Sequence, residues 1–466
     1  MQKKTKILCT LGPASMSRGV LARMRAAGMD AARINTAHGE FGQYAKMIAE
    51  VRTLDGVPVL LDIKGPEIRV RVKKPIHVKE GETVHAGFAP GKNAWFSYDF
   101  SREVKPGDRV LIDGGKLCFT VKEVSRGAVR LCAFNDGVIC NRKGVNIPGR
   151  SLKVPSLSKK DVEAITFAKR HGVEFIALSF TRSREDVREL KRRIGKAGIA
   201  VIAKIENPEG VKNIDGILAE ADGVMVARGD LGVEVGTEKV PLIQKEIIRK
   251  ANERGKIAIT ATQMLESMIT EPFPTRAETS DVANAVLDGS DAVMLSGETA
   301  VGKYPVETVK EMAKIAREVE DRVACKVEMG MPGDISSVVS EAIYRASEQM
   351  KFDRIVTITR SGHTARIISR YRPGPPILAV TFSETVRNQC ALTFGVTPYY
   401  MPRKPKHGLI ARTAKFLFEQ GAISEKDVLL FTAGVLTKRE HESNLIEIHC
   451  ACELLEAHKE RMRRGR

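Results

Sequence analysis

Short apolar runs rich in Val, Ile and Ala alternate with amphipathic stretches through the N-terminal part of this chain. Such a run, bounded by turn residues, is typical of a buried strand, and apolar residues at helical spacing are typical of a helix that packs on one side. Strands that alternate with helices predict a parallel sheet, because each helix returns the chain to the start of the next strand. Eight strands are expected, at residues 6–10, 31–35, 57–63, 174–180, 200–206, 223–228, 257–263 and 292–296.

Eight parallel strands with intervening helices predict a closed (β/α)8 barrel, the TIM barrel. Five amphipathic helices are expected between the strands, at residues 41–54, 159–171, 184–196, 241–254 and 275–287. An open, doubly wound sheet is the alternative, but eight strand–helix units favour closure. The residues that do chemistry are then expected at the C-terminal ends of the strands.

The gap between the third and fourth strands is too long for one helix and follows a different pattern. Short alternating runs are separated by turns such as Pro106-Gly107-Asp108, which is typical of a small all-β domain. Its strands are expected at residues 69–73, 83–86, 109–112, 118–124 and 128–133. An insertion in a loop on the active rim predicts a lid over the barrel.

A turn-rich linker at 329–334 precedes a second α/β unit, with strands expected at residues 355–359, 377–381, 396–400, 428–433 and 445–449. The predicted organisation is a catalytic barrel at 1–69 and 148–330, a lid domain at 70–147, and a C-terminal α/β regulatory domain at 335–466.

Composition narrows the functional classes. The net charge is +18, but the Lys and Arg residues are spread along helices, and one Trp and seven Tyr make a base-stacking surface for nucleic acid improbable. No apolar run is long enough to cross a bilayer, the N-terminus resembles a strand and not a signal peptide, and the eight Cys show no zinc spacing. These features predict a cytoplasmic enzyme without a nucleic-acid or membrane partner.

The fifth and sixth strands carry a group suited to a phosphorylated substrate. Lys204 and Glu206 point to the same side at the end of the strand before Pro208, and Asp230 follows the next strand. Neighbouring parallel strands bring these ends together, so one cation and two hard oxygen ligands should meet. The alternative is that Lys204 and Glu206 form only a structural ion pair.

Every strand end carries residues that resemble those of the pyruvate kinase family, in the same order along the chain. The matching segments are 4–15, 32–39, 61–69, 144–149, 203–208, 223–232, 261–270 and 291–299. Eight correctly spaced segments are far more specific than any single motif. The resemblance implies transfer of a phosphoryl group from phosphoenolpyruvate to ADP, giving pyruvate and ATP in the last step of glycolysis.

The resemblance also implies roles for individual residues. Arg33 and Lys204 would hold the phosphoryl group, and Lys204 would stabilise the departing enolate. Backbone amides of Arg228, Gly229 and Asp230 would bind the substrate carboxylate, together with Thr262, which would also order the water that protonates the enolate. Glu206 and Asp230 would ligate Mg²⁺. Nucleotide contacts are expected from four residues, Asn35, His38, Arg69 and Lys143.

A second cation, K⁺, is suggested by the resemblance at Asn35, Asp62 and Ile63, but the sequence departs from the family pattern there. Ala37 stands where the pattern has Ser, and Ile63 stands where it has Thr. Ala37 has no side-chain oxygen for K⁺, whereas Ile63 can still offer its backbone carbonyl. Glu67, by contrast, is the residue that accompanies K⁺ dependence. The sequence leaves the K⁺ requirement open.

In the C-terminal domain, Thr359, Ser361, Gly362 and Thr364 follow a strand and open a helix. This loop resembles the family's site for a phosphorylated effector, although a plain helix start has a similar sequence. The resemblance further implies a homotetramer. Two other classes stay open: a barrel lyase that uses Mg²⁺ and an enolate, and a basic nucleic-acid-binding protein with an inactive barrel.

Overall fold

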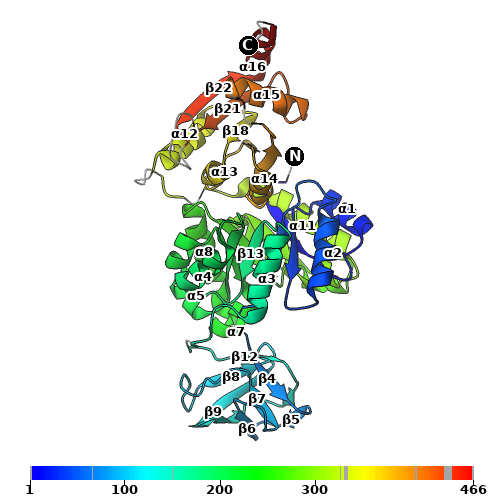
Figure 1. Ribbon diagram of the computed structural model, residues 1–466, viewed down its shortest axis with the longest axis vertical. Helices are drawn as coiled ribbons and strands as arrows, with labels where there is room; N and C mark the ends of the chain where they lie inside the picture. The colour runs from blue at the N-terminus through cyan, green and yellow to red at the C-terminus, as the bar shows by residue number, and fades with distance from the viewer. Residues whose placement is uncertain are drawn as a thin grey trace.

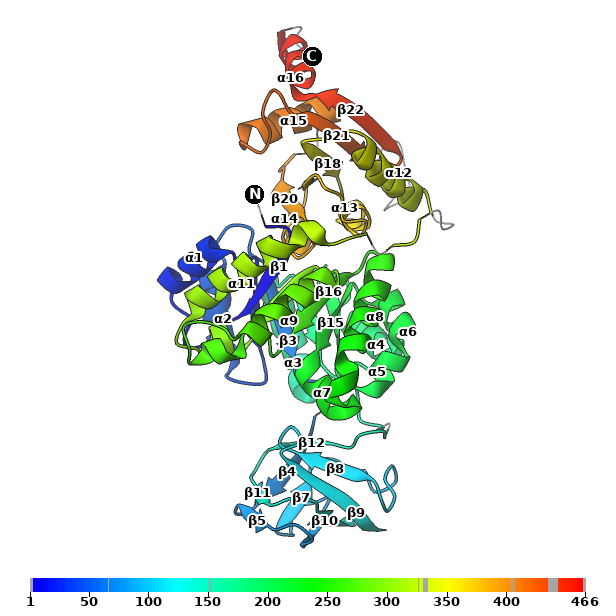
Figure 2. The ribbon, with the colours of Figure 1, turned by 180° about the vertical axis from the view of Figure 1, so that it is seen from behind.

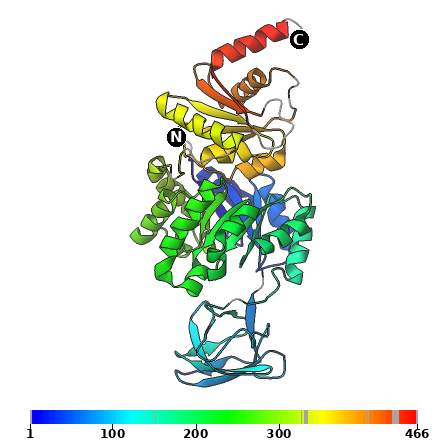
Figure 3. The ribbon, with the colours of Figure 1, turned by 90° about the vertical axis from the view of Figure 1, so that its left-hand side faces the viewer.

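Three bodies lie in a row along the long axis of the computed structural model (Figure 1). The C-terminal α/β domain lies at one end, the large barrel in the middle, and a small β-barrel at the other end; a side view shows the same order (Figure 3). The structure describes residues 3–65, 67–150, 152–325, 327–329, 334–403, 405, 407–434 and 443–463. Within these residues, no helix is both long and apolar enough to cross a membrane.

The central barrel is closed by eight parallel strands in the order β1-β17-β16-β15-β14-β13-β3-β2. The predicted TIM barrel is confirmed, and the open-sheet alternative is wrong. The strands are β1 (Lys6–Thr10), β2 (Ala31–Asn35), β3 (Val59–Ile63), β13 (Phe175–Leu178), β14 (Ala200–Ile205), β15 (Gly223–Ala227), β16 (Ile257–Ala261) and β17 (Ala292–Leu295). Five of the predicted strands run past the observed C-terminal ends, because the residues there turn into the loops that carry polar side chains.

Helices surround this barrel and bury one face each against the strands (Figure 2). The longer ones are α1 (Arg18–Ala27), α2 (Phe41–Val51), α3 (Lys159–Arg170), α4 (Arg184–Ile194), α6 (Ile214–Glu220), α7 (Arg228–Val235), α8 (Val240–Glu253), α9 (Arg276–Leu287) and α11 (Pro305–Val319). Capping boxes start α2, α3 and α9; in α3 and α9 the Ser158 and Thr275 side chains accept from the amides of Asp161 and Glu278, whose carboxylates reach back.

The segment after β3 forms a second, smaller closed barrel, in the order β10-β6-β7-β4-β12-β8-β9, with a two-stranded ribbon of β11 and β5. Its strands are β4 (Ile68–Val72), β5 (Ile76–Val78), β6 (Thr83–Gly87), β7 (Ala94–Phe96), β8 (Arg109–Ile112), β9 (Leu117–Ser125), β10 (Ala128–Ala133), β11 (Gly137–Ile139) and β12 (Gly144–Asn146). The four strands that the sequence did not reveal have three residues each, too few for an alternating pattern. We call this body the lid.

The C-terminal domain is a five-stranded sheet in the order β20-β19-β18-β21-β22, in which only β22 is antiparallel to its neighbour. The strands are β18 (Arg354–Ile358), β19 (Ile377–Thr381), β20 (Val396–Tyr400), β21 (Val428–Ala433) and β22 (Leu445–Cys450). The helices are α12 (Ile335–Gln349), α13 (His363–Ser369), α14 (Glu384–Cys390), α15 (Leu409–Glu419) and α16 (Ala451–Arg463).

This domain closes the N-terminal end of the central barrel. Leu392 is fully buried among the side chains that fill the barrel interior, so a residue of one domain completes the core of another. Beside it, Arg372 donates to the Asp291 carboxylate at 3.0 Å and to the Gly289 carbonyl at 2.7 Å. The amide of Phe394 also donates to Asp291. The opposite end of the barrel therefore remains for the lid.

We expect the Arg372–Asp291 ion pair to be essential for this closure. Only 2% of the Arg372 side chain and 6% of the Asp291 side chain are exposed. Asp291→Asn leaves a buried guanidinium without its counter-charge, which should lower the free energy of unfolding by about 3–5 kcal/mol. Urea unfolding followed by circular dichroism measures this change.

The matched control is Asp55→Asn, which breaks another ion pair between the same two bodies. Asp55 pairs with Arg387 at 2.8 Å, but 90% of its side chain is exposed, so little change is expected. Equal changes in the free energy of unfolding for the two substitutions would show that burial does not make the Arg372–Asp291 pair more stabilising than the exposed pair.

Candidate active site between barrel and lid

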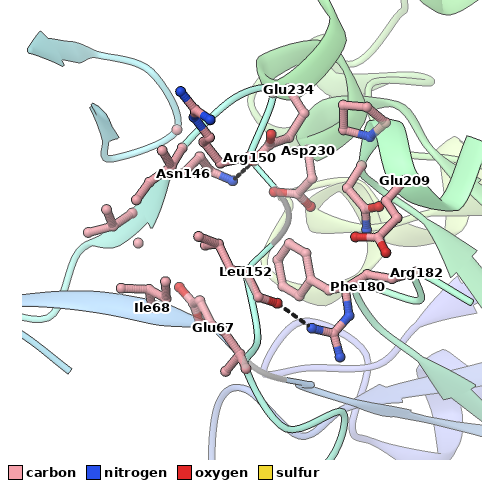
Figure 4. A pocket seen from close by; sticks show the side chains of 18 of the residues that line it. Glu67, Ile68, Asn146, Arg150, Leu152, Phe180, Arg182, Glu209, Asp230 and Glu234 are labelled. Carbon is pink, nitrogen blue, oxygen red and sulfur yellow. Dashed lines mark hydrogen bonds between the residues drawn. The ribbon is translucent and has the colours of Figure 1, made fainter. Parts of the chain in front are cut away.

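A cavity of about 610 Å³ lies between the C-terminal end of the central barrel and the lid (Figure 4). The lid contributes Ile68, Gly144 and Asn146 to its wall, and the barrel contributes Phe180 and Asp230. The predicted active rim and the predicted lid therefore enclose a space large enough for a small substrate.

The Asp62 carboxylate, near the C-terminal end of β3, holds two cations at this end of the barrel. The Nε and Nη2 atoms of Arg33 lie 2.9 and 2.7 Å from Asp62 Oδ2, and Lys204 Nζ lies 3.3 Å from the same oxygen. Burial alone would raise the pKa of Asp62, but Lys204 and Arg33 outweigh it and hold the pKa below 3.8. Burial would lower the pKa of Lys204, but Asp62 and Glu206 raise it above 10.5, so the ammonium stays charged.

Ser179, which the sequence reasoning missed, completes this group. Lys204 Nζ donates to Ser179 Oγ at 2.7 Å, and that hydroxyl donates to Asp62 Oδ1 at 3.1 Å. The serine thereby fixes the direction of the ammonium. It follows β13 directly, so the rule that strand ends carry functional side chains could have identified it.

Glu206 and Asp230 form an acidic group next to Lys204. Glu206 Oε1 lies 2.9 Å from Lys204 Nζ, and Glu206 Oε2 accepts from the Phe180 amide at 2.6 Å. Burial raises the pKa of Glu206 above 4.5, and the Asp230 charge adds to the rise. Burial likewise raises the pKa of Asp230 above 3.8, with Glu67 and Asp62 adding to it, although Asp230 is accessible from the cavity.

Mg²⁺ fits this acidic group. Two carboxylates that repel each other, with Glu206 buried, gain much from a divalent cation, and Mg²⁺ completes its six positions with water and substrate oxygens. In the described part of the chain, no three His, Cys, Asp or Glu side chains are grouped for a metal, so a cation here would need such outside ligands.

The residues suggested for K⁺ already have other partners in this structure. Asn35 Oδ1 already accepts from the Ala37 amide at 3.0 Å, and Ala37 itself has no oxygen in its side chain. The Asp62 carboxylate is occupied by the donors described above, and Ile63 offers one carbonyl, which accepts from the Ser179 amide at 3.4 Å.

Thr262 lies just after β16 in a left-handed backbone conformation, with φ of 68°, and Gln263 follows at 54°. Such φ values are rare outside glycine. The Arg228 guanidinium holds this turn, since it donates to the Thr262 carbonyl at 2.7 Å and the Gln263 carbonyl at 2.8 Å. The Arg228 side chain also pairs with Asp281 and thus positions Thr262.

Two of the groups expected to bind the substrate carboxylate contact each other. Thr262 Oγ1 accepts from the Gly229 amide at 2.9 Å, at the first turn of α7, and donates to the Ala261 carbonyl at 2.6 Å. A carboxylate that binds at the start of α7 would therefore replace Thr262 Oγ1 as the acceptor of the Gly229 amide.

The four predicted nucleotide residues do not form one cluster. His38 is exposed, and its carbonyl accepts from the Tyr44 hydroxyl at 2.6 Å. Arg69, in the lid, donates to Glu67 at 2.7 Å and to the Arg142 carbonyl, while Lys143 donates to Asp113 at 3.0 Å. Asn35 belongs to the turn described above. Within the described residues, no hydrogen bond joins these four to one another.

Two contacts tie the lid side of the cavity to the barrel (Figure 4). Asn146 of β12 donates to Glu234 of α7 at 2.7 Å, and Arg182 donates to the Leu152 carbonyl at 2.8 Å. Burial raises the pKa of Glu234 above 4.5, although the Asn146 hydrogen bond opposes that rise. Because α7 carries both Glu234 and Asp230, the helix that contacts the lid also carries one of the two carboxylates of the acidic group.

Cations and carboxylates converge at the C-terminal ends of the barrel strands, on the side of the barrel that faces the lid. This arrangement suits positioning and charge neutralisation of a phosphoryl group, and it defines the class of barrel phosphotransferases.

Comparisons with known proteins identify the family. The sequence matches the family described as "Pyruvate kinase, barrel domain" over residues 2–309 and "Pyruvate kinase, alpha/beta domain" over residues 337–449. Pyruvate kinases of Sporosarcina psychrophila and Geobacillus stearothermophilus are 40% and 41% identical, over 97% and 98% of this chain and 81% of their own lengths. A crystal structure of a pyruvate kinase from Cryptosporidium parvum has a TM-score of 0.90 at 34% identity, and covers 97% of this chain and 96% of that one.

This chain belongs to the pyruvate kinase family, as its strand-end residues predicted. It is a phosphotransferase of glycolysis that moves a phosphoryl group from phosphoenolpyruvate to ADP, giving pyruvate and ATP. The lyase and nucleic-acid-binding alternatives are thereby wrong.

The acidic group predicts a pH dependence of Mg²⁺ affinity. A protonated carboxyl group is a poor ligand, and the pKa values of Glu206 and Asp230 are both raised, so the apparent dissociation constant should rise as the pH falls toward them. Calorimetric titration of MgCl₂ into the protein over a pH series measures this directly. Asp230→Asn should give weaker binding with a shallower pH profile. An affinity of the unaltered protein that does not weaken as the pH is lowered toward the pKa values of these two carboxyl groups would contradict the assignment.

Proposed function

We propose that the phosphoryl group is transferred over the Asp62 group, with Lys204 and Arg33 as the residues that hold it. The observation that supports this most is the shared carboxylate: Asp62 holds both cations at the C-terminal end of the barrel while Ser179 fixes the Lys204 ammonium. Cations that are already oriented need no reorganisation when charge develops in the transition state.

The bond changes set what each residue must do. The bond between phosphorus and the enol oxygen of phosphoenolpyruvate breaks, and a bond forms to a β-phosphate oxygen of ADP, which is already anionic and needs no base. Lys204 would neutralise the oxygen that becomes an enolate. Arg33, whose planar fork also donates to Thr10 Oγ1 at 2.9 Å, would keep the phosphoryl oxygens in place.

The substrate carboxylate is proposed to bind at the first turn of α7. The amides of Arg228, Gly229 and Asp230 lie there, where the positive end of the helix dipole favours an anion. Thr262 adds a hydroxyl, and once its bond to Gly229 is exchanged it can order the water that gives a proton to the enolate carbon. Arg228 contributes through its amide, since its side chain holds the Thr262–Gln263 turn.

Glu206 and Asp230 are proposed as the protein ligands of Mg²⁺, which when bound would neutralise negative charge on the phosphoryl group. The nucleotide is proposed to enter from the lid side, with Arg69 and Lys143 as its cations and Asn35 and His38 at the opposite edge. Arg69 and Lys143 are paired with Glu67 and Asp113 in this structure, so they would have to change partners. No step of this account uses K⁺.

Substitution of Lys204 tests the central assignment. Lys204→Ala should lower kcat by about 10²–10³-fold or more, with a smaller change in KM for phosphoenolpyruvate, because its charge acts mainly in the transition state. A coupled assay of pyruvate formation measures both constants. The control is Lys191→Ala, which removes a half-exposed lysine of α4 that pairs with Asp222. Near-normal turnover in Lys204→Ala would exclude Lys204 from the reaction, even though the family activity would stand.

A phosphorylated effector is proposed to bind the loop between β18 and α13. Thr359 Oγ1 accepts from the Gly362 amide at 3.0 Å, and Thr364 Oγ1 contacts Ser443 Oγ at 2.7 Å, so the turn is formed in advance. A ligand in a separate domain can affect the barrel only by favouring one arrangement of an oligomer, for which we propose a homotetramer.

Titration of sugar phosphates and nucleoside monophosphates against phosphoenolpyruvate saturation tests this effector site. A bound effector should shift the apparent affinity about 5–150-fold, and Thr364→Val should reduce the shift. Light scattering on the same samples should show four chains. Saturation curves that no compound moves would refute the effector, and a monomer would refute the tetramer.

A further inference from the structure

Two cysteines meet at the junction of β22 and α16, at the end of the molecule opposite the lid (Figure 1). Cys450 is the last residue of β22, and Cys452 lies in the first turn of α16. Their sulfur atoms are 2.7 Å apart, which is closer than two sulfurs that merely pack together. Only Ala451 separates them in the sequence, and its amide is fixed to the Asp427 carbonyl at 2.9 Å.

The backbone on both sides holds this pair in place. Cys450 lies opposite Val428 in the β21–β22 ladder, and the Cys452 amide donates to the Glu425 carbonyl at 3.0 Å. The same carbonyl accepts from the Cys450 thiol at 3.6 Å. Because strand pairing and the turn before β21 both fix the positions, the two thiols face each other as a consequence of the fold.

The pair is also accessible. Both cysteines are partly exposed, so a small reagent can reach the sulfurs. The hydrogen bond with Cys450 raises the pKa of Cys452 above 9.0, so the Cys452 thiol is protonated at neutral pH. His449 points to the other side of the strand, where it bonds to Glu447 at 2.8 Å. In the described residues no third ligand joins the two sulfurs to make a metal site.

The other six cysteines lack this combination. Cys9 and Cys390 are buried, and burial raises the pKa of both, that of Cys390 to about 11. Burial also raises the pKa of Cys325. The remaining three are partly exposed lid residues, and none of them has a sulfur partner among the described contacts: Cys118, Cys132 and Cys140.

We propose that Cys450 and Cys452 form a reversible dithiol–disulfide centre whose oxidant is a low-molecular-weight disulfide. In the first step the sulfur of one cysteine, after losing its proton, attacks the disulfide, whose sulfur–sulfur bond breaks and releases one thiol. In the second step the other cysteine attacks the mixed disulfide and releases the second thiol. The protein loses two electrons and two protons, and the small disulfide gains both. A bond that closes over a single residue has little freedom to reach ideal geometry, which favours ready reduction.

Oxidised glutathione is the probe. The full-length protein, first reduced and then freed of reductant, is incubated with it, remaining thiols are alkylated with iodoacetamide, and peptides are analysed by mass spectrometry without reduction. The peptide that contains both cysteines should be two hydrogens lighter, carry no glutathione and no alkyl group, and regain both thiols with dithiothreitol.

Cys450→Ser and Cys452→Ser separate this intramolecular reaction from ordinary thiol chemistry. Each variant should stop at the first step and retain one glutathione on the remaining cysteine, because no neighbouring thiol can displace it. Cys132→Ser, in the lid, should behave as the unaltered protein does. Unchanged pyruvate formation shows that the variants are folded, since neither cysteine lies near the barrel mouth.

A second reagent examines the reduced pair without oxidation. Phenylarsine oxide bridges two adjacent thiols, so it should bind one-to-one to the unaltered protein and be lost in both serine variants. Glutathione that stays on the Cys450–Cys452 peptide of the unaltered protein, or two alkylated thiols after treatment with oxidised glutathione, would overturn the proposal. Equal binding of the arsenical by the variants would also overturn it.

Discussion

The buried carboxylate of Asp62 is the interaction on which the active site depends. Arg33 and Lys204 come from β2 and β14, far apart in the sequence, and would repel each other in a region of low dielectric if nothing separated them. Asp62 lies between them at the end of β3 and contacts both. Without the two cations, burial would favour a neutral carboxyl group there, so each partner requires the others.

Strand register makes this arrangement possible. Asn35 of β2 pairs with Asp62 of β3, and Leu178 of β13 pairs with Ile63, so the C-terminal ends of three neighbouring strands finish at one level. Arg33 and Lys204 then lie beside the acidic group of Glu206 and Asp230, at the end of the barrel that faces the lid. The contact between Asn146 and Glu234 joins the lid to α7, the helix that carries Asp230.

The barrel and most of its site residues were predictable from the sequence because each barrel strand has a recognisable local pattern. The barrel strands are buried on both faces, which gives continuous apolar runs, and polar residues that follow such runs, such as Lys204 and Asp230, stand out. Ser179 could not be recognised in this way, because a serine after a strand is common and its partner Lys204 lies in a different strand. The three-residue strands of the lid are too short to show an alternating pattern of apolar and polar residues.

Other features depend on contacts that no local pattern encodes. The Arg228 side chain turns back to the Thr262–Gln263 turn because that backbone is left-handed, which the sequence does not show. The insertion of Leu392 into the barrel core and the pairing of Asp291 with Arg372 follow from how two domains meet. Cys450 and Cys452 were overlooked because their spacing is not that of a zinc site. The domain boundaries at residues 69, 147 and 335 and the roles of individual site residues stay predictions.

Anomalous diffraction from crystals grown with Mn²⁺ and phosphoenolpyruvate, without ADP, tests the account most directly. It predicts one strong Mn²⁺ peak within about 2.2 Å of carboxylate oxygens of both Glu206 and Asp230, with the substrate phosphoryl group in contact with Arg33 and Lys204. A Mn²⁺ peak elsewhere, or a phosphoryl group that contacts neither cation, would contradict it.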